Sequence, residues 1–442
     1  MAEDWFIMTA TALGAAIAAG TIDPRDLAEA FLAAVARHPH GPAIYARATP
    51  ERARAEAAAA ADRARAGLRR GPLDGVPLAW KDLFDTAGIA TEGGSALLAG
   101  RIPGRDAAVV GAATRAGLVC LGKTHLSELA FSGLGINPVT ATAPNVHDPA
   151  LAPGGSSSGS AVAVAFGLAP AAIGSDTAGS GRIPAAWNDL VGLKTTHGLL
   201  SLDGALPLRP GFDTVGPITR TVEDAALLLA ALGGPAVDLA GAGLHRVRLL
   251  VVDEPAALPA RDVPQAAFEA ALARLAAAGA RIDRGPLAAV APTLALFPVV
   301  AAGEAYAIWR EAIEANPDAM FAPIRDRFRA GGAIAAADHV AGLRALDLQR
   351  RAWRDATAGH DAVLLPTTAN LPPKVAELLA DPARYAAENL LALRNPTLAN
   401  LLGLCALTLP TGTPACGLML MAAGGGDARL LRLGRAAERA LG

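Results

Sequence analysis

Apolar residues recur at helical spacing through most of the first 70 residues of the chain. The pattern is present in TATALGAAIAAG (9–20), in DLAEAFLAAVARH (26–38) and in the alanine- and arginine-rich segment 51–67. A spacing of three to four residues places apolar side chains on one face of a helix. We therefore predict an amphipathic first helix, a second helix that begins near Asp23 and Pro24, and a third over 51–67.

From residue 71 onward, short apolar runs alternate with helical segments. Buried strands are predicted at 76–80 and at 118–124, and the first of them ends at Lys81. A helix is predicted between them, over 106–117. This alternation is typical of α/β proteins. Further predicted elements are strands at 245–253, 361–368 and 407–422 and helices at 264–279 and 427–441.

The chain of 442 residues is longer than most single domains, but no repeat and no long polar linker divides it. We therefore predict one α/β domain over residues 1–442. Its catalytic core is expected at about 71–225. A mainly helical region, at about 286–351, is expected to cover the substrate pocket.

The mean hydropathy of +0.34 raises the question of a membrane segment. The longest apolar stretch, 286–303, contains Pro286, Pro292 and Pro298, whereas a spanning helix needs about 20 uninterrupted apolar residues. Acidic residues Glu3 and Asp4 precede the first apolar helix, where an export signal carries positive charge. We therefore predict no membrane association and a cytoplasmic location.

Charge and cysteine content narrow the function further. The formal net charge is −2, which gives no basic field to bind nucleic acid. Cys120, Cys405 and Cys416 are odd in number and flanked by apolar residues, as expected for reduced core thiols in the cytoplasm. No Cys/His cluster has zinc-site spacing. We predict no metal and no cofactor.

The segment PGGSSSGSAVAVAFGLAPAAIGSDTAGSGRIP (153–184) holds two glycine-serine loops, 154–159 and 177–181, separated by a compact apolar segment. Such loops offer a hydroxyl nucleophile beside backbone N–H groups that can hold an oxyanion. Residues 155–159 match G-x-S-x-G, but a nucleophile elbow at Ser157 requires a preceding strand, and here a proline-broken loop precedes it. A phosphate-binding loop requires lysine at the position occupied by Ser160.

A candidate base for these loops lies upstream. Only four of the 39 lysine and arginine residues are lysine, and one of them is Lys81, in GVPLAWKD. A serine hydroxyl needs a base to accept its proton. Burial beside Trp80 disfavours the ammonium form, and a decrease of about three pKa units would make Lys81 a base near neutral pH. Strand alternation directs Asp82 to the opposite face.

Together these segments resemble the amidase signature family, whose hydrolases use a Ser–Ser–Lys triad. The resemblance rests on GGSSSGSA (154–161), SDTAGSGRIP (175–184) and Lys81, and extends from about residue 8 to the end. Matching blocks occur in one order with consistent spacing, which is more specific than any single motif. These blocks include GKTHLSELAFSGLGIN (122–137), VGLKTTHGLLSLDG (191–204) and FDTVGPITRTVEDA (212–225).

The resemblance implies a mixed, mostly buried β-sheet covered by helices on both faces. It also implies catalytic roles: Ser180 is the nucleophile, Lys81 the general base, and Ser156 the bridging serine, which follows a cis peptide bond after Gly155. The two serines are 24 residues apart. The expected oxyanion donors are the N–H groups of Thr177, Ala178, Gly179 and Ser180, and the supporting residues are Ser157, Asp176 and Arg182. A Ser–His–Asp site built on His125, His147 or His197 is disfavoured, since each lies in one of these blocks or in the loop before 154.

The nucleophile loop departs from the common G-G-S-I-R pattern and reads A-G-S-G-R, with Ala178 and Gly181 at the changed positions. This variant resembles the amidase domain of allophanate hydrolases, which act on a small urea-derived carboxylate. Gly181 could alternatively widen the acyl pocket.

The expected reaction is hydrolysis of a carboxamide or a related carbamate (urethane) through an acyl-enzyme. The alternative is the glutaminase-type component of a tRNA-dependent amidotransferase, working with a partner chain. The intact set of Lys81, Ser156 and Ser180 argues against a non-catalytic relative. We expect a monomer or homodimer.

Overall fold

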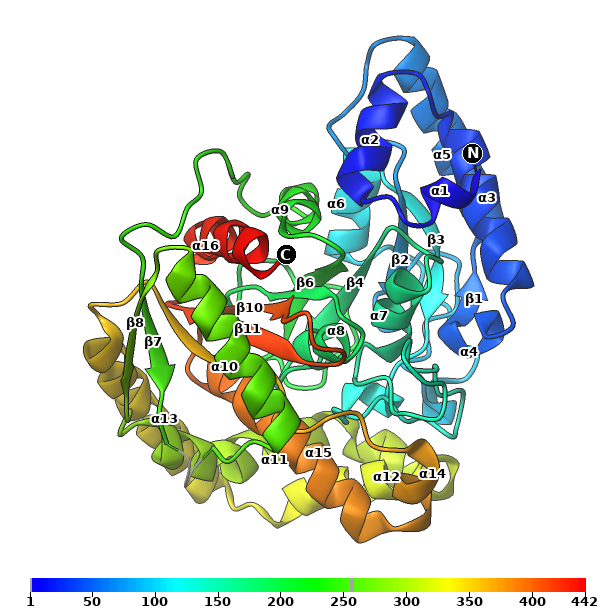
Figure 1. Cartoon of the computed structure of the whole chain (residues 1–442). Helices are drawn as coiled ribbons and strands as arrows, with labels where there is room; N and C mark the ends of the chain where they lie inside the picture. Colours follow the sequence, from blue (N-terminus) through cyan, green and yellow to red (C-terminus); the bar gives the residue numbers. More distant parts are fainter. Residues whose placement is uncertain (1, 255–257) are drawn as a thin grey trace.

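The computed structural model describes residues 2–254 and 258–442. Its centre is an eleven-stranded sheet with both parallel and antiparallel pairs (Figure 1). The strands are β1 (Tyr45–Ala48), β2 (Pro77–Lys81), β3 (Val119–Thr124), β4 (Ala171–Asp176), β5 (Val191–Lys194), β6 (Thr214–Thr219), β7 (Arg248–Val252), β8 (Arg281–Gly285), β9 (Ala362–Pro366), β10 (Cys405–Pro410) and β11 (Gly417–Ala422). Their order across the sheet is β1-β3-β2-β4-β6-β5-β10-β11-β9-β7-β8.

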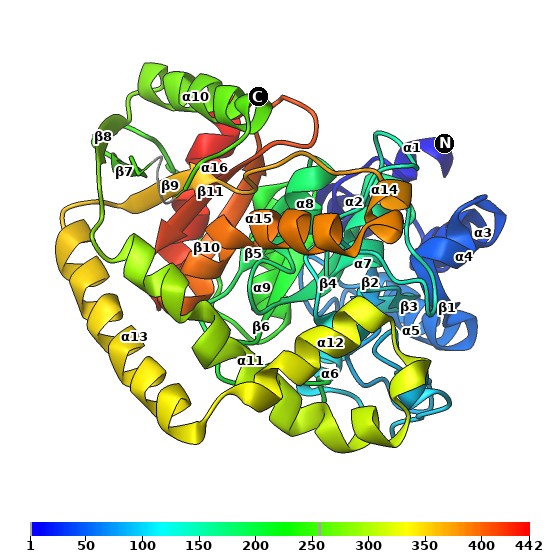
Figure 2. The same cartoon turned by 90° about the horizontal axis from the view of Figure 1, so that it is seen from below.

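Helices surround this sheet (Figures 1 and 2). They are α1 (Ala2–Trp5), α2 (Ala10–Ala18), α3 (Pro24–Arg37), α4 (Gly41–Ile44), α5 (Pro50–Arg65), α6 (Ala108–Ala116), α7 (Ser158–Ala165), α8 (Arg182–Trp187), α9 (Val222–Ala231), α10 (Asp262–Ala277), α11 (Val290–Ala315), α12 (Ala322–Ala330), α13 (Ala336–Thr357), α14 (Val375–Ala380), α15 (Pro382–Leu401) and α16 (Asp427–Leu441).

Strand β10 shows how helices cover both faces. Leu407 lies against Gly434 of α16, whereas the next residue, Thr408, lies beside Gly192, which also meets Ala185 of α8. Successive side chains of a strand point to opposite faces, so α16 and α8 lie on opposite sides of the sheet. This confirms the expected α/β fold with a mixed sheet between helices.

Two predicted boundaries are confirmed at the level of single residues. Helix α3 begins after Asp23, whose side chain accepts a hydrogen bond from the Arg25 N–H, and Pro24 occupies the first turn. Strand β2 ends at Lys81 and is buried along its whole length. It pairs in parallel with β3 and β4, which places Lys81 in the interior.

The glycine-serine segment 153–184 contains more regular structure than its composition indicates. Between its two loops lie α7 and β4, both buried. Helix α7 is formed by small residues that are buried around the whole helix, so it has no amphipathic pattern to detect. The two loops are therefore fixed at the ends of a packed helix and a central strand.

The prediction that prolines interrupt the apolar stretch 286–303 is wrong, because α11 continues through Pro292 and Pro298. Pro292 lies in the first turn, where no intrahelical partner for an N–H exists. By length and composition alone, α11 could cross a membrane. Here it packs against α12, α13 and α15, and Val300, Ala305 and Ile313 are buried in the protein.

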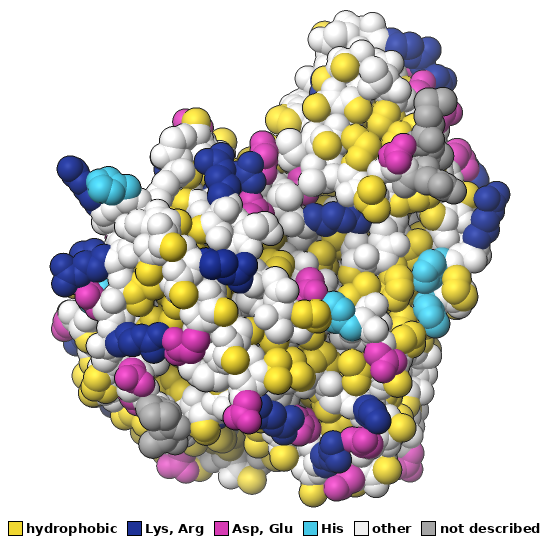
Figure 3. Space-filling model, viewed as in Figure 1, with side chains coloured by type: hydrophobic (Ala, Val, Ile, Leu, Met, Phe, Trp, Pro, Cys, Tyr) yellow, Lys and Arg dark blue, Asp and Glu magenta, His cyan; other side chains and the backbone are white. Residues whose placement is uncertain are grey.

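The region 286–351 is mainly helical, as predicted, and consists chiefly of α11, α12 and most of α13. Figure 2 shows these helices as an outer layer beyond α15. On the face shown in Figure 3, acidic and basic side chains are interspersed, in agreement with the formal net charge of −2.

Candidate active site

Lys81 lies at the carboxyl end of β2 and is fully buried. Its Nζ atom donates to Ser156 Oγ at 2.7 Å and to Ser175 Oγ at 2.8 Å. Both partners are hydroxyl groups, which can accept from an amine or donate to it. The lysine is therefore held in contact with one of the two predicted catalytic serines.

Burial lowers the pKa of Lys81 to about 7, and the carboxylates of Asp176 and Asp213 act in the opposite direction. The ordinary pKa of a lysine is near 10.5. In water-excluded surroundings the charged ammonium loses its hydration, which favours the neutral amine. About half of the Lys81 side chains are therefore neutral at pH 7 and able to accept a proton.

The bridging position is occupied by Ser156, which is buried and follows a cis peptide bond between Gly155 and Ser156. The next residue, Ser157, donates its N–H to the carbonyl oxygen of Ser180 at 3.1 Å. The Ser157 hydroxyl donates to the carbonyl oxygen of Ser175 at 3.2 Å. The structure thus brings the two serine loops together beside Lys81.

Among the described residues, Ser157 makes no hydrogen bond with Lys81, and the second hydrogen-bond partner of the lysine is Ser175, which sequence reasoning missed. The parallel register of β2 and β4 pairs Trp80 with Ile173, which brings the end of β4 level with Lys81. Knowledge of that strand pairing would have identified Ser175.

An ion pair holds the loop that carries Ser180. Arg182 Nε donates to Asp176 Oδ2 at 2.9 Å, and the pair is buried. Asp176 also accepts from Asn400 of α15 at 2.9 Å. Burial opposes ionisation of Asp176, but the charge and hydrogen bonds of Arg182 hold its pKa well below the usual range. The loop is therefore anchored to β4 and α15.

The four predicted oxyanion donors are not equivalent. Gly179 donates its N–H to Asp176 Oδ1 at 2.8 Å, so this amide already has an acceptor. In the part of the chain that the structure describes, the N–H groups of Thr177, Ala178 and Ser180 have no protein acceptor. These three amides are the ones free to bind an oxyanion.

Two glycines flank the nucleophile for different reasons. Gly179 has a φ of 116°, and a Cβ atom there would lie 2.5 Å from Pro396, so this position requires glycine. Gly181 has a φ of −96°, and a Cβ atom there would meet Asp176 at an ordinary contact distance of 3.6 Å. A Cβ atom is therefore tolerated at position 181 but not at position 179.

Other residues considered from the sequence have partners away from this site. Lys123 lies 3.1 Å from Asp82 Oδ1, and Lys194 donates to the carbonyl oxygens of Thr195 and Leu404. The histidines contact other groups: His125 lies next to the Pro42 carbonyl, His147 next to Asp189 and His197 next to the Pro210 carbonyl.

Three hollows surround the site, and two of them border the nucleophile loop. A 200 Å³ cavity is lined by Ser175, Thr177 and Asp213 together with apolar residues that include Ala130 and Leu208. A 430 Å³ groove between α11 and α15 extends to Thr397, whose hydroxyl donates to the carbonyl oxygen of Ala178 at 3.4 Å. The cavity therefore adjoins the loop at Thr177, and the groove approaches it through Thr397.

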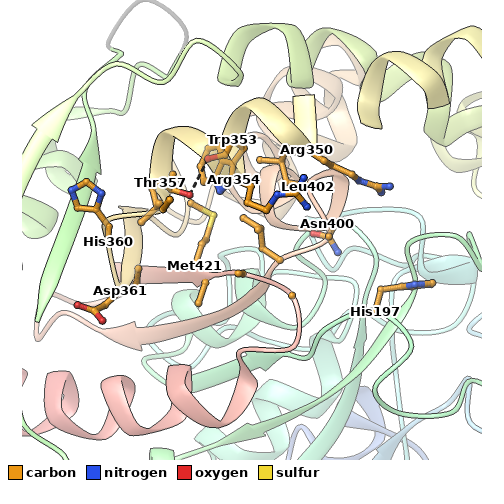
Figure 4. A pocket seen from close by; sticks show the side chains of 18 of the residues that line it. His197, Arg350, Trp353, Arg354, Thr357, His360, Asp361, Asn400, Leu402 and Met421 are labelled. Atoms are coloured by element: carbon orange, nitrogen blue, oxygen red, sulfur yellow. Dashed lines mark hydrogen bonds between the residues drawn. The ribbon is translucent and has the colours of Figure 1, made fainter. Parts of the chain in front are cut away.

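Another hollow, of 610 Å³, does not include Lys81, Ser156 or Ser180 in its lining. Figure 4 shows Asn400 and His197 on one side of it and His360 and Asp361 on the other. It reaches the nucleophile loop only through Asn400, so size alone does not identify the reactive site. Among the described residues, no group of three or more His, Cys, Asp or Glu side chains could hold a metal ion.

Comparison with known proteins gives one family. The family model Amidase matches residues 26–431. The 2-amino-5-chloromuconic acid deaminase of Comamonas testosteroni is 35% identical over 405 residues, which cover 88% of this chain and 87% of that protein. A crystal structure described as an amidase is 31% identical, with a TM-score of 0.89 over 98% of this chain and all of that one.

A component of the glutamyl-tRNA(Gln) amidotransferase of Anaeromyxobacter sp. (strain K) is 42% identical over 221 residues, which cover 50% of this chain and 45% of that protein. The match to this relative thus spans about half of each protein, whereas the deaminase and the crystal structure match nearly throughout. The chain belongs to the amidase family and is a hydrolase of carbon–nitrogen bonds.

Proposed function

We propose that the protein is a serine amidohydrolase that cleaves a carboxamide, or a related carbamate, through an acyl-enzyme on Ser180. Ser180 Oγ bonds to the carbonyl carbon while its proton passes through Ser156 to neutral Lys81. The proton then returns through Ser156 to the leaving nitrogen as the C–N bond breaks. Water then attacks the ester that the acyl group forms with Ser180, and its proton passes through Ser156 to Lys81. That proton returns to Ser180 Oγ as the ester bond breaks, which releases the acid and restores Ser180.

The observation that carries this proposal is the buried contact of Lys81 with Ser156. A 2.7 Å hydrogen bond joins a lysine whose pKa is lowered to about 7 to a hydroxyl in the loop next to Ser180. A lysine kept for structure alone would be paired with a carboxylate or with carbonyl oxygens, as Lys123 and Lys194 are.

Charge that develops on the carbonyl oxygen needs donors that are in place before the reaction. The N–H groups of Thr177, Ala178 and Ser180 are suited to this role because they have no acceptor within the described protein. Gly179 supports the loop through Asp176 instead. Asp176, Arg182 and Ser157 act as positioning residues, since each holds the backbone of the nucleophile loop.

Ammonia is the leaving group that we expect. The Comamonas relative is named for removing an amino group, and the 200 Å³ cavity beside Ser175 and Thr177 is small. Primary amides, carbamates and allophanate are therefore the first compounds to test.

The three cysteines are free and buried, which supports the expected cytoplasmic location.

A second candidate is the glutaminase-type component of a tRNA-dependent amidotransferase. The 42% identity to such a component over 221 residues favours it. This function requires a partner chain, so it predicts co-purification of a second protein and release of ammonia from glutamine. The better coverage by the deaminase relative favours the free-standing amidase.

Ser180→Ala tests the proposed mechanism most directly. We expect activity toward any amide substrate to fall by about 10⁴-fold or more, because loss of the nucleophile removes the covalent route. Ammonia release from a panel of amides, glutamine, allophanate and carbamates measures it. Retention of activity with an unchanged circular dichroism spectrum would show that Ser180 is not the nucleophile.

A further inference from the structure

Arg209 is a buried arginine whose guanidinium has no acceptor among the described residues. It precedes β6 and is 2% exposed. Its Nε atom is buried without a hydrogen-bond partner, and no described carboxylate forms an ion pair with the side chain. Buried arginines are ordinarily paired, as Arg182 is with Asp176. The burial of Arg209 therefore requires another explanation.

A second guanidinium lies on the same aromatic ring. The Arg209 Cζ atom is 5.2 Å from the centroid of the Phe131 ring, and the Arg327 Cζ atom is 4.4 Å from it. Arg327, on α12, donates to the Phe131 carbonyl oxygen at 3.0 Å and makes no ion pair with a described residue. Arg209 also lies 5.2 Å from the Phe297 ring. Two cations thus lie against the Phe131 ring.

The surroundings disfavour these charges. Burial and the charge of Arg327 lower the pKa of Arg209 to about 9, while Asp213 and Glu304 oppose the decrease. Those two acids have other partners. Asp213 accepts from the Thr177 hydroxyl and from the N–H groups of Leu208 and Arg209. Glu304 accepts from the Gly211 N–H. The two guanidiniums keep unused donors for an external anion.

The residues on either side of Arg209 border the same cavity as the nucleophile loop. The 200 Å³ cavity that touches Thr177 is also lined by Ala130, next to Phe131, and by Leu208 and Pro210, on either side of Arg209.

On the other side of Arg209, the Phe297 ring packs against the apolar cluster that contains Ala178 and Ile183. Phe297 and Thr397 line the groove between α11 and α15. The ring against Arg209 thus lies beside both the nucleophile loop and this groove.

We propose that Arg209 and Arg327 bind a carboxylate of the substrate, so that the enzyme acts on small amides that carry a carboxylate group. This inference rests on the proposed function of Ser180. A guanidinium presents a planar set of N–H donors that matches the two oxygens of a carboxylate. The aromatic rings exclude water from the pair and strengthen its attraction.

Matched substrate pairs test the inference. Succinamate and glutaramate, which carry a carboxylate, are compared with butanamide and pentanamide, which have the same number of carbon atoms without the charge. We expect the wild type to prefer the carboxylates in kcat/KM. In Arg209→Met the preference should fall by about 10- to 100-fold, the range for loss of a charged hydrogen bond. Arg209→Lys should restore part of it.

Arg344→Met is the matched control, because Arg344 is exposed on α13 and its loss changes the net charge equally. It should leave the preference unchanged. If Arg209→Met does not fold, Arg327→Met gives the same comparison on a partly exposed residue. A wild type without a carboxylate preference, or an equal loss for both substrate classes in the variants, would overturn the inference.

Calorimetry with glutarate separates this inference from the proposed function. Glutarate should bind the Ser180→Ala protein, and Arg209→Met added to it should weaken binding by a similar factor. Binding that depends on Arg209, without hydrolysis of any amide by the wild type, would support the carboxylate site and contradict the serine amidohydrolase. Hydrolysis of neutral amides without glutarate binding would support the serine amidohydrolase and contradict the carboxylate site.

Discussion

Lys81 and Lys123 lie on neighbouring strands of one sheet, and both are fully buried, but their surroundings differ. The parallel register pairs Trp80 with Lys123 and Lys81 with Thr124, so the two lysines point to opposite faces. Lys81 contacts two serine hydroxyls. Lys123 contacts Asp82 at 3.1 Å and the Thr91 hydroxyl at 2.8 Å.

The difference teaches that the partners, more than the burial, decide what a buried lysine can do. Burial lowers the pKa of both lysines. At Lys123, the charge of Asp82 and its hydrogen bond act against this decrease. The carboxylates that act on Lys81 form no ion pair with it. One face of the two strands therefore holds a lysine bound to hydroxyl groups, and the other face holds an ion pair.

Of the changes that test this difference, Lys81→Met should have the largest effect on activity. Loss of the general base should lower kcat/KM by about 10²- to 10⁴-fold, while the melting temperature stays near that of the wild type because no ion pair is broken. Kinetics and thermal denaturation measure the two quantities. A decrease in kcat/KM of less than threefold would show that a group other than Lys81 accepts the proton.

The pH dependence of the wild type gives the next largest effect. Only neutral Lys81 accepts a proton, so kcat/KM should rise with pH through an apparent pKa of about 7 and then level off. The decrease between pH 7.5 and pH 5 should be on the order of 100-fold. Activity that continues to rise toward pH 10 would indicate a lysine in ordinary surroundings.

Lys123→Met should have the smallest effect on activity. It leaves Asp82 buried with Arg47 as its remaining ion-pair partner, which should lower the free energy of unfolding by about 3 kcal/mol. The kcat of the folded protein should stay within about threefold of the wild type. Urea denaturation and kinetics on the same sample test both values. If kcat fell as far as in Lys81→Met, the two faces would not be independent.

Much of this site could be predicted from the sequence, because its residues lie in short blocks with local signals. The end of β2 at Lys81 follows from an apolar run, and Asp23 and Pro24 mark the start of α3. Ser175, Arg209 and Arg327 were missed, because their roles depend on which segments pack together. Ser175 becomes a partner of Lys81 only through the pairing of β2 with β4.

The elements missed by sequence reasoning have a related cause. Helix α7 has no polar face, and β4 is a short strand within a glycine-serine segment, so tertiary packing decides both. Helix α11 continues past two prolines because contacts with neighbouring helices stabilise it. Local patterns carry no information on such contacts.

The difference between Gly179 and Gly181 has a consequence for how this enzyme can change. The backbone on one side of the nucleophile permits glycine alone, because Pro396 lies against it. On the other side the backbone is in a conformation that every amino acid adopts, and a Cβ atom there would meet Asp176 at an ordinary contact distance. A change from glycine to alanine at position 181 can therefore alter the volume next to Ser180 without a clash with the loop. This position gives evolution, or an engineer, a way to change substrate scope while the chemistry stays fixed.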